Sequence, residues 1–273
     1  MLKPIALAIL MAASQASSAA TSWSYDFSGD FGAHFDTFWA PTYPEVVEQT
    51  GGVLQFHTNG QQVSHTDAIY LYKDVSFDVS QSWVAQLDVS VPASLRSQPD
   101  SPTGETYASP QLIVATFNDD GSLRRALSID LEVSPPYGSL FWTGVFVPGS
   151  TTDDIQAHRL TSDTAGTVKV SFDATTQQFT SWDPYGPLMN VTLADAGWVM
   201  NGTDKFQFIV GFGVENMFIP PDEVLSLDNL TVSLQPVPEP ETYALMLAGL
   251  GLVGLAAQHR KYQRPLIEKG DES

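Results

Sequence analysis

Apolar and polar residues alternate along much of this chain, starting at Trp23. The segments Trp23–Phe27 and Val53–His57 alternate with a period of two, as does Trp83–Val91. In Trp83–Val91 the odd-numbered residues are all apolar, and the polar ones fall between them: Gln86, Asp88 and Ser90. A period of two predicts strands with one buried face, and no amphipathic helical stretch exceeds a turn or two. The pattern predicts an all-β protein.

Two hairpins stand out among the predicted strands. Gln111–Phe117 and Ser122–Val133 flank the turn sequence Asn118-Asp119-Asp120-Gly121, which favours a tight reversal of the chain. Thr167–Asp173 and Gln178–Asp183 alternate on both arms of a second hairpin. Hairpins of this kind are typical of antiparallel sheets.

No internal repeat and no shift of composition divides residues 21–235. We therefore expect one antiparallel β-sandwich domain over this range. The segment Pro92–Pro110 is rich in Ser, Pro and Gly and predicts a long surface loop.

The N-terminus has the three parts of a secretory signal. Lys3 supplies a positive charge, Ile5–Ala13 is apolar, and Ser18–Ala20 consists of small residues. This order predicts a signal peptide over residues 1–20, which is removed so that the mature chain begins at Thr21.

The C-terminal region has a comparable order of parts. A short motif comes first: Val237, Pro238, Glu239 and Pro240. The apolar run Tyr243–Ala257 follows, and then a basic cluster: His259, Arg260, Lys261 and Arg264. The apolar run predicts a membrane helix with its basic end in the cytoplasm. Fifteen residues span only about 22 Å, less than a hydrocarbon core of about 30 Å, so the length favours a temporary anchor.

Residues 236–264 resemble the PEP-CTERM sorting signal of Gram-negative bacterial surface proteins. The resemblance implies that an exosortase-type membrane protease processes the chain near Pro238-Glu239-Pro240. It also implies a transient membrane anchor and final placement at the cell surface or in the extracellular matrix, in bacteria that produce exopolysaccharide. The tail 265–273 departs from the family, in which chains end soon after the basic cluster. An ordinary membrane anchor behind a proline-rich linker is the alternative.

The composition limits the classes of partner. The chain has 12 Lys plus Arg against 31 Asp plus Glu, a net charge of −19, and no cysteine. Nucleic acids and anionic lipid surfaces are therefore not expected as partners, because binding to phosphate requires clustered cations. Disulfides and thiol chemistry are excluded.

The second half of the domain resembles concanavalin A-like jelly rolls, the fold of legume-type lectins and laminarinase-like glucanases. The hairpin within residues 167–183 is similar to their back-sheet hairpin, and Phe206–Asn216 is similar to a lectin strand. Glu223–Leu234 would be the closing strand beside the first. The resemblance implies a concave sheet that binds carbohydrate.

The main candidate site lies in Ala126–Val133. Period-two geometry places Ser128, Asp130 and Glu132 on one face of a strand. Laminarinase-like hydrolases carry Glu-x-Asp-x-Glu at such a strand, with the two glutamates as nucleophile and acid/base. Ser128 occupies the first glutamate position and has no carboxylate, so we expect binding without catalysis. An exposed acidic face without a ligand is the alternative.

Aromatic residues follow this strand: Tyr137, Phe141, Trp142 and Phe146. We expect them in a loop, with Trp142 or a neighbour stacking on a sugar ring. Packing of these rings under the loop is the alternative.

The resemblance to legume-type lectins implies a metal site in which Asp130 and Glu132 combine with donors from the following loop: Asp153, Asp154 and His158. The resemblance to jelly-roll carbohydrate modules implies a structural calcium between Asp26 on the first strand and Asp228 on the last.

The sequence thus predicts an exported, non-catalytic, carbohydrate-binding β-sandwich. A structural matrix protein without a specific ligand and a glycoside hydrolase-like enzyme are the alternatives. Ice binding would require a flat array of threonines, whereas Thr151-Thr152 and Thr175-Thr176 are isolated pairs.

Overall fold

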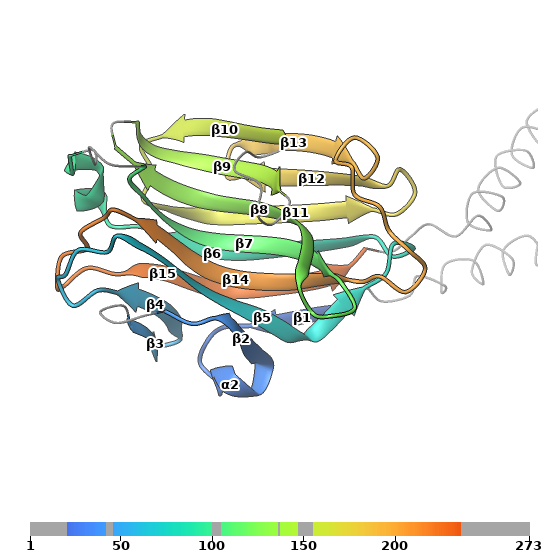
Figure 1. The fold of residues 1–273 in the computed structure, drawn as a ribbon, viewed down its shortest axis with the longest axis horizontal. Helices are drawn as coiled ribbons and strands as arrows, with labels where there is room; N and C mark the ends of the chain where they lie inside the picture. The colour runs from blue at the N-terminus through green and yellow to red at the C-terminus, as the bar shows by residue number, and fades with distance from the viewer. Residues whose placement is uncertain (1–20, 42–45, 100–104, 136, 147–154, 236–273) are drawn as a thin grey trace, which may run out of the picture. The chain divides into compact units, whose positions relative to one another are not determined.

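Two antiparallel sheets face each other in the part of the chain that can be described (Figure 1). A computed structural model describes residues 21–41, 46–99, 105–135, 137–146 and 155–235. The predicted signal peptide and the whole C-terminal region from residue 236 lie outside these ranges. The described residues belong to one compact unit.

The eight-stranded sheet contains the second hairpin and the first and last strands of the domain. Its spatial order is β13 (Gly186–Thr192), β12 (Gln178–Asp183), β11 (Ala165–Asp173), β6 (Trp83–Ser90), β15 (Leu225–Leu234), β4 (Val53–His57) and β3 (Val46–Thr50). β1 (Ser22–Tyr25) pairs with β15, from Ser22 opposite Ser233 to Tyr25 opposite Leu230. The closing strand therefore lies beside the first strand, as predicted.

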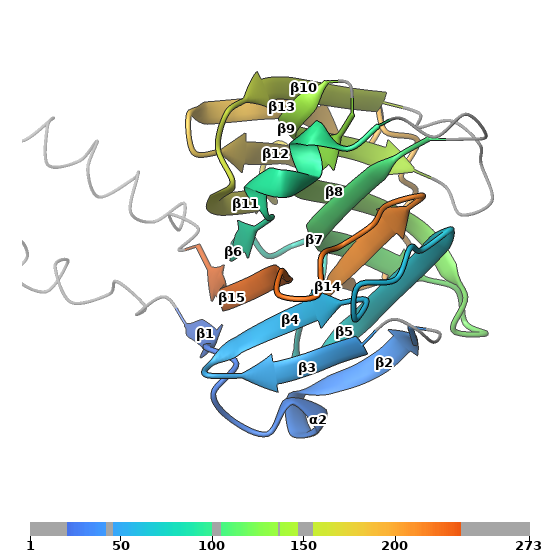
Figure 2. The same cartoon turned by 90° about the vertical axis from the view of Figure 1, so that its left-hand side faces the viewer.

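The seven-stranded sheet contains the first hairpin. Its spatial order is β10 (Ile155–Thr161), β9 (Gly138–Phe146), β8 (Leu123–Ser134), β7 (Tyr107–Phe117), β14 (Phe206–Glu215), β5 (His65–Phe77) and β2 (Phe35–Trp39). Two short helical turns complete the described chain: α2 (Phe31–His34) and η1 (Ala93–Ser97). Figure 2 shows the sandwich from the side, with β10 and β13 at one end and β2 and β3 at the other.

The region between residues 92 and 110 differs from the predicted loop. Residues 93–97 form η1, and strand β7 already begins at Tyr107, so that Pro110 lies inside a strand. The paired residues of β7 and β8 skip from Ala108 to Gln111. Proline lacks the backbone N–H that the ladder needs, and the pairing is interrupted at this point.

Aromatic rings fill one end of the core between the sheets. Trp83 is fully buried and contacts five phenylalanine rings at centroid distances between 5.0 and 6.4 Å: Phe77, Phe172, Phe179, Phe206 and Phe208. The alternation predicted for Trp83–Val91 is confirmed, because every odd-numbered residue of this segment is buried. Trp83 joins strands of both sheets through one side chain.

Replacing Trp83 should therefore weaken the whole sandwich. We expect Trp83→Ala to lower the free energy of unfolding by about 3–5 kcal/mol, because a buried ring is lost and a cavity remains. Urea denaturation of residues 21–235 measures the change. Trp39→Ala is the control, since Trp39 is 46% exposed; an equal loss in both variants would contradict the central role of Trp83.

Candidate functional site

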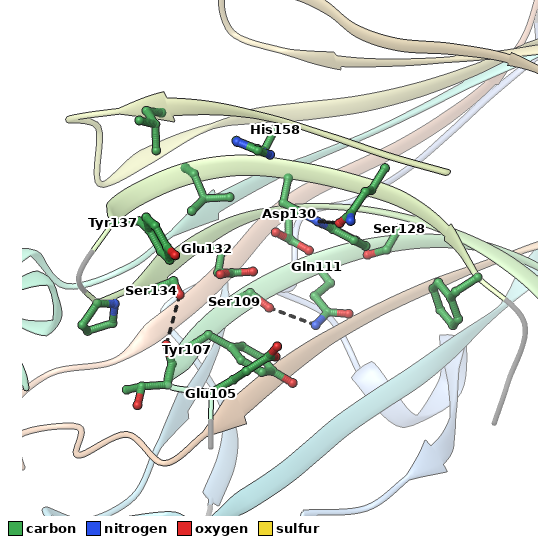
Figure 3. A pocket seen from close by; sticks show the side chains of 17 residues that line it. Glu105, Tyr107, Ser109, Gln111, Ser128, Asp130, Glu132, Ser134, Tyr137 and His158 are labelled. Carbon is green, nitrogen blue, oxygen red and sulfur yellow. Dashed lines mark hydrogen bonds between the residues drawn. The ribbon is translucent and has the colours of Figure 1, made fainter. Parts of the chain in front are cut away.

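A groove with a volume of about 1010 Å³ lies on the outer face of the seven-stranded sheet (Figure 3). Its floor is made by alternate residues of four neighbouring strands, β7 to β10, and by short segments at their ends. Residues of β8 alternate between this groove and the core: Asp130 lines the groove, whereas Ile129 and Leu131 are fully buried between the sheets.

Cross-strand pairing aligns the groove side chains in a row. Gln111 is opposite Asp130, Asp130 is opposite Trp142, and Trp142 is opposite His158. All four line the groove. Directly opposed residues have Cβ atoms about 4.5–5.5 Å apart, so an amide, a carboxylate, an indole and an imidazole adjoin one another. The structure thus brings Asp130, Glu132 and Trp142 into one site.

Trp142 belongs to strand β9 and not to a loop, contrary to the prediction from sequence. Its indole lies along the sheet over Gly144, where an added Cβ would come within 2.4 Å of the ring. The indole Nε1 donates a hydrogen bond to Oε1 of Gln156 at 3.3 Å. The neighbouring Phe141 faces the core and is fully buried. The alternation of β9 therefore separates the aromatic residues that the sequence grouped together.

Ser128 lies on the groove floor and is only 3% exposed. Its Oγ is buried and has no hydrogen-bond partner among the described residues, while its carbonyl oxygen accepts a bond from Thr143 Oγ1 at 2.8 Å. A buried hydroxyl without a partner costs free energy, and such a group commonly marks a place where a water or ligand binds.

Carboxylates give the groove a negative character. Burial raises the pKa of Glu132 to about 7, the Ser134 hydroxyl opposes this shift, and the charge of Glu105 adds to it. Asp130 is 3% exposed, so the alternative of an exposed acidic face is wrong for this residue.

The acidic character continues beyond the groove on β14 and β5. His65 Nδ1 bonds to Glu215 Oε2, and its Nε2 lies 3.5 Å from Asp67 Oδ2. Tyr107 lies between these groups and the groove; burial raises the pKa of its hydroxyl, and nearby carboxylates add to the shift. Gly213 leaves space for the side chain of Gln111, because a Cβ at position 213 would lie 2.6 Å from Gln111 Nε2.

Sequence reasoning missed Tyr107 and Gln111 as site residues. Tyr107 was assigned to the predicted loop, and Gln111 was assigned to a strand without a functional role. In a strand that continues Gln111–Phe117 towards the N-terminus, Tyr107 and Gln111 share one face, because they are an even number of residues apart. Leu112 lies on the other face. Their pairing with Glu215 and Asp130 depends on the sheet order, which the sequence does not contain.

The carboxylates of the calcium site predicted at Asp26 and Asp228 accept hydrogen bonds from neighbouring protein groups. Asp228 is near Asp88 and Asp26, whose charges add to the effect of burial in raising its pKa. The oxygens of Asp88 accept bonds from Thr167 and Asn229, and Asp26 accepts bonds from Ser28. Within the described ranges, no group of three or more acidic or histidine side chains is arranged to hold a metal ion.

The structure describes only some of the residues of the other predicted calcium site. His158 lies on strand β10, in the groove, rather than in a loop. Asp153 and Asp154 lie outside the described residues. A combination of these three with Asp130 and Glu132 stays a prediction.

This architecture is that of a concanavalin A-like sandwich. The chain is similar to the catalytic domain of an endo-1,3-β-glucanase (laminarinase) from Thermotoga petrophila RKU-1, with a TM-score of 0.52 and 12% identity over 79% of this chain and 98% of that one. It is also similar to the carbohydrate recognition domain of Emp47p, with a TM-score of 0.50 and 12% identity over 81% and 99% of the two chains. At this identity the likeness concerns the fold.

The C-terminal region gives a more particular result. Residues 236–261 match the family model of the PEP-CTERM protein-sorting motif, so the resemblance seen in the sequence is confirmed. The motif indicates an exported protein that an exosortase processes. A comparison with curated proteins finds no match.

The helical segments of the described chain, α2 and η1, are single turns and are too short to span a membrane. The predicted helix over residues 243–257 lies outside the ranges that the structure describes.

The raised pKa of Glu132 predicts a pH-dependent stability. The folded chain holds a proton on Glu132 between about pH 4.5 and 7, where the unfolded chain has lost it, so this group destabilises the fold as pH rises through that window. We expect Glu132→Gln to be more stable than the wild type above about pH 7, by up to about 3 kcal/mol, and equal to it near pH 4.5. Denaturation at several pH values measures this. Asp119→Asn is the control at an exposed turn, and a pH-independent difference for Glu132→Gln would contradict the prediction.

Proposed function

We propose that residues 21–235 form a non-catalytic carbohydrate-binding domain whose binding site is the groove on the seven-stranded sheet. The observation that carries this proposal is the position of the Trp142 indole against Gly144, in the groove and in one row with Asp130 and Gln111. An indole with an open face stacks on the apolar C–H side of a sugar ring. Carboxylate and amide groups next to it accept or donate hydrogen bonds to the sugar hydroxyls.

The dimensions of the groove suit several sugar units in a chain. Its volume of about 1010 Å³ is at the upper end of the range for ligand sites, and its rim carries exposed apolar groups, Tyr137 at 70% and Leu160 at 63%. Both sides of an extended saccharide would thus find apolar contacts. The fold shared with a carbohydrate recognition domain supports the same proposal.

Ser128 has a hydroxyl at the position where a retaining glycosidase would carry a carboxylate. A retaining glycosidase needs two carboxyl groups about 5–5.5 Å apart, one of them as nucleophile. The strand face presents a hydroxyl at the first of the three positions, and a hydroxyl cannot form the glycosyl intermediate of that mechanism.

A hydrolase is the second candidate, and one observation favours it. The pKa of Glu132, raised to about 7, suits a general acid at neutral pH. Release of reducing ends from oligosaccharides, lost in Glu132→Gln, would decide for this candidate.

The cellular part of the proposal concerns the C-terminal region. We infer that residues 236–264 hold the exported chain in the membrane until an exosortase acts near Pro238-Glu239-Pro240. The domain is then left at the cell surface or in the extracellular matrix. A structural matrix protein without a ligand would have the same destination, so binding has to be tested separately.

The first prediction concerns binding. A glycan array probed with residues 21–235 should give a defined set of saccharides, and Trp142→Ala and Asp130→Ala should each weaken their binding by about tenfold or more, since a stacking ring or a buried hydrogen-bonding carboxylate is lost. Gly144→Ala should have a similar effect, because the new methyl group displaces the indole. Trp182→Ala on the opposite sheet is the matched control. Arms with and without a chelator test for calcium, and an array that is empty in both arms would favour the structural protein.

The second prediction concerns processing. Mass spectrometry of the protein released by its host should show a chain that begins at Thr21 and ends near Pro238-Glu239-Pro240. Alanine replacement of Pro238 and Pro240 should keep the full C-terminus, because the recognised motif is lost. A released form that still contains residues 265–269 would contradict the proposal.

A further inference from the structure

The charges of the groove restrict the saccharide it can bind. Three carboxylates line the groove, Glu105, Asp130 and Glu132. Asp67 and Glu215 lie next to Tyr107 beyond the groove, where both approach the imidazole of His65. None of the Lys or Arg residues within the described ranges lines the groove, and its one imidazole among the described residues is that of His158. The segments 42–45, 100–104 and 147–154 contain neither Lys nor Arg. Carboxylates therefore outnumber the basic side chains of the groove by three to one.

The basic residues of the domain are used elsewhere. Lys73 pairs with Asp36, Arg124 with Asp204, and Arg159 with Asp183. Arg96 bonds to Ser139 and to carbonyl oxygens, and Lys169 lies over the ring of Trp182. These contacts lie outside the groove, so the acidity of the groove is a local property and not only a consequence of the total charge.

A second observation, independent of charge, marks the same floor as a ligand site. The Ser128 hydroxyl is buried without a partner in the described structure, beside the row that contains Asp130 and Trp142. A group held at this point can bond to Ser128 and to the neighbouring carboxylates. Figure 3 shows Ser128, Asp130 and Glu132 along the same strand.

We propose that the groove is specific for saccharides with free amino groups, the protonated hexosamines, over neutral and acidic saccharides. This inference rests on the proposed carbohydrate binding and names its substrate class. An ammonium group donates three hydrogen bonds and offsets the repulsion among the groove carboxylates. A uronic acid or sulfated sugar would add a like charge to the groove and be rejected.

The stacking surface distinguishes a sugar from a cationic peptide. Trp142 packs against Gly144 and donates a hydrogen bond to Gln156, and an indole held in this way offers a ring surface on which a pyranose can stack. The carboxylates lie beside this plane, where substituents of a stacked ring would project. A lysine side chain would use the charges but leave the plane without a partner.

The experiment compares matched pairs of ligands. Hexamers of glucosamine and of galactosamine, each in the free-amine and the N-acetylated form, are titrated into residues 21–235 by calorimetry at about pH 6, where the amino groups carry their charge. At least one free-amine hexamer should bind about tenfold more tightly than its acetylated counterpart. Binding should weaken with added salt and release a proton from Glu132, seen as a dependence of the heat on the buffer.

Variants test whether the preference for free-amine saccharides comes from the groove. Glu132→Gln should lower the affinity for the free amine about tenfold and change the affinity for the acetylated form less than about twofold. Asp119→Asn makes the corresponding acid-to-amide replacement at an exposed turn and should change neither. Trp142→Ala should abolish binding of both forms. A lysine hexamer of equal charge should bind weakly and be insensitive to Trp142→Ala.

Each contrary result has a separate meaning. Equal or tighter binding of the acetylated hexamers overturns the inference and leaves the groove a saccharide site. Equal effects of Glu132→Gln and Asp119→Asn also overturn it, because the preference would then come from the total charge. If no hexamer binds and the glycan array is empty as well, the proposed function itself fails.

Discussion

The pairing of β7, β8 and β9 is the constraint on which both the core and the groove depend. In each of these strands one set of alternate residues packs between the sheets, and the other set makes the groove floor. A slip of one residue in β8 would bury Asp130 and Glu132 between the sheets and expose Ile129 and Leu131. The fully buried aliphatic residues of β8 therefore fix the register that places the groove carboxylates beside Gln111 and Trp142. Stability and function are set by the same alternation.

Much of the fold could be predicted from the sequence because alternation is a local property. The face of Trp83–Val91 and the hairpin of β11 and β12 follow from patterns within a few residues. The pairing of the closing strand with β1 is long-range, and it was expected only from the resemblance to jelly rolls. Two predicted loops contain strand residues in the structure. Residues 107–110 belong to β7, where proline and serine reduce the local signal for a strand but β8 and β14 pair on both sides. Trp142 belongs to β9, which pairs with β8 and β10.

The site could be predicted in part for the same reason. Ser128, Asp130 and Glu132 share a face by their spacing alone, and the structure places them together. The contribution of Tyr107, Gln111 and Gln156 depends on which strands are neighbours, and no local pattern encodes that order. Gly144 is a clear case: in the sequence it is one glycine among 20, and only the fold shows that it makes room for an indole.

The proposed ligand binding would explain features of the groove that stability alone does not. Burying Glu132 near Glu105 destabilises the fold above neutral pH, and leaving the Ser128 hydroxyl without a partner adds to that cost. An apolar face at this position would remove both costs, as the other end of the same sheet demonstrates: there Ile69, Ile113 and Ile209 cover the outer face with an apolar cluster. The outer face of the seven-stranded sheet thus has one part that is covered by apolar side chains and one part, the groove, whose polar side chains lower the free energy of unfolding. Polar groups that weaken the fold are typical of functional sites, and here they surround the plane of Trp142.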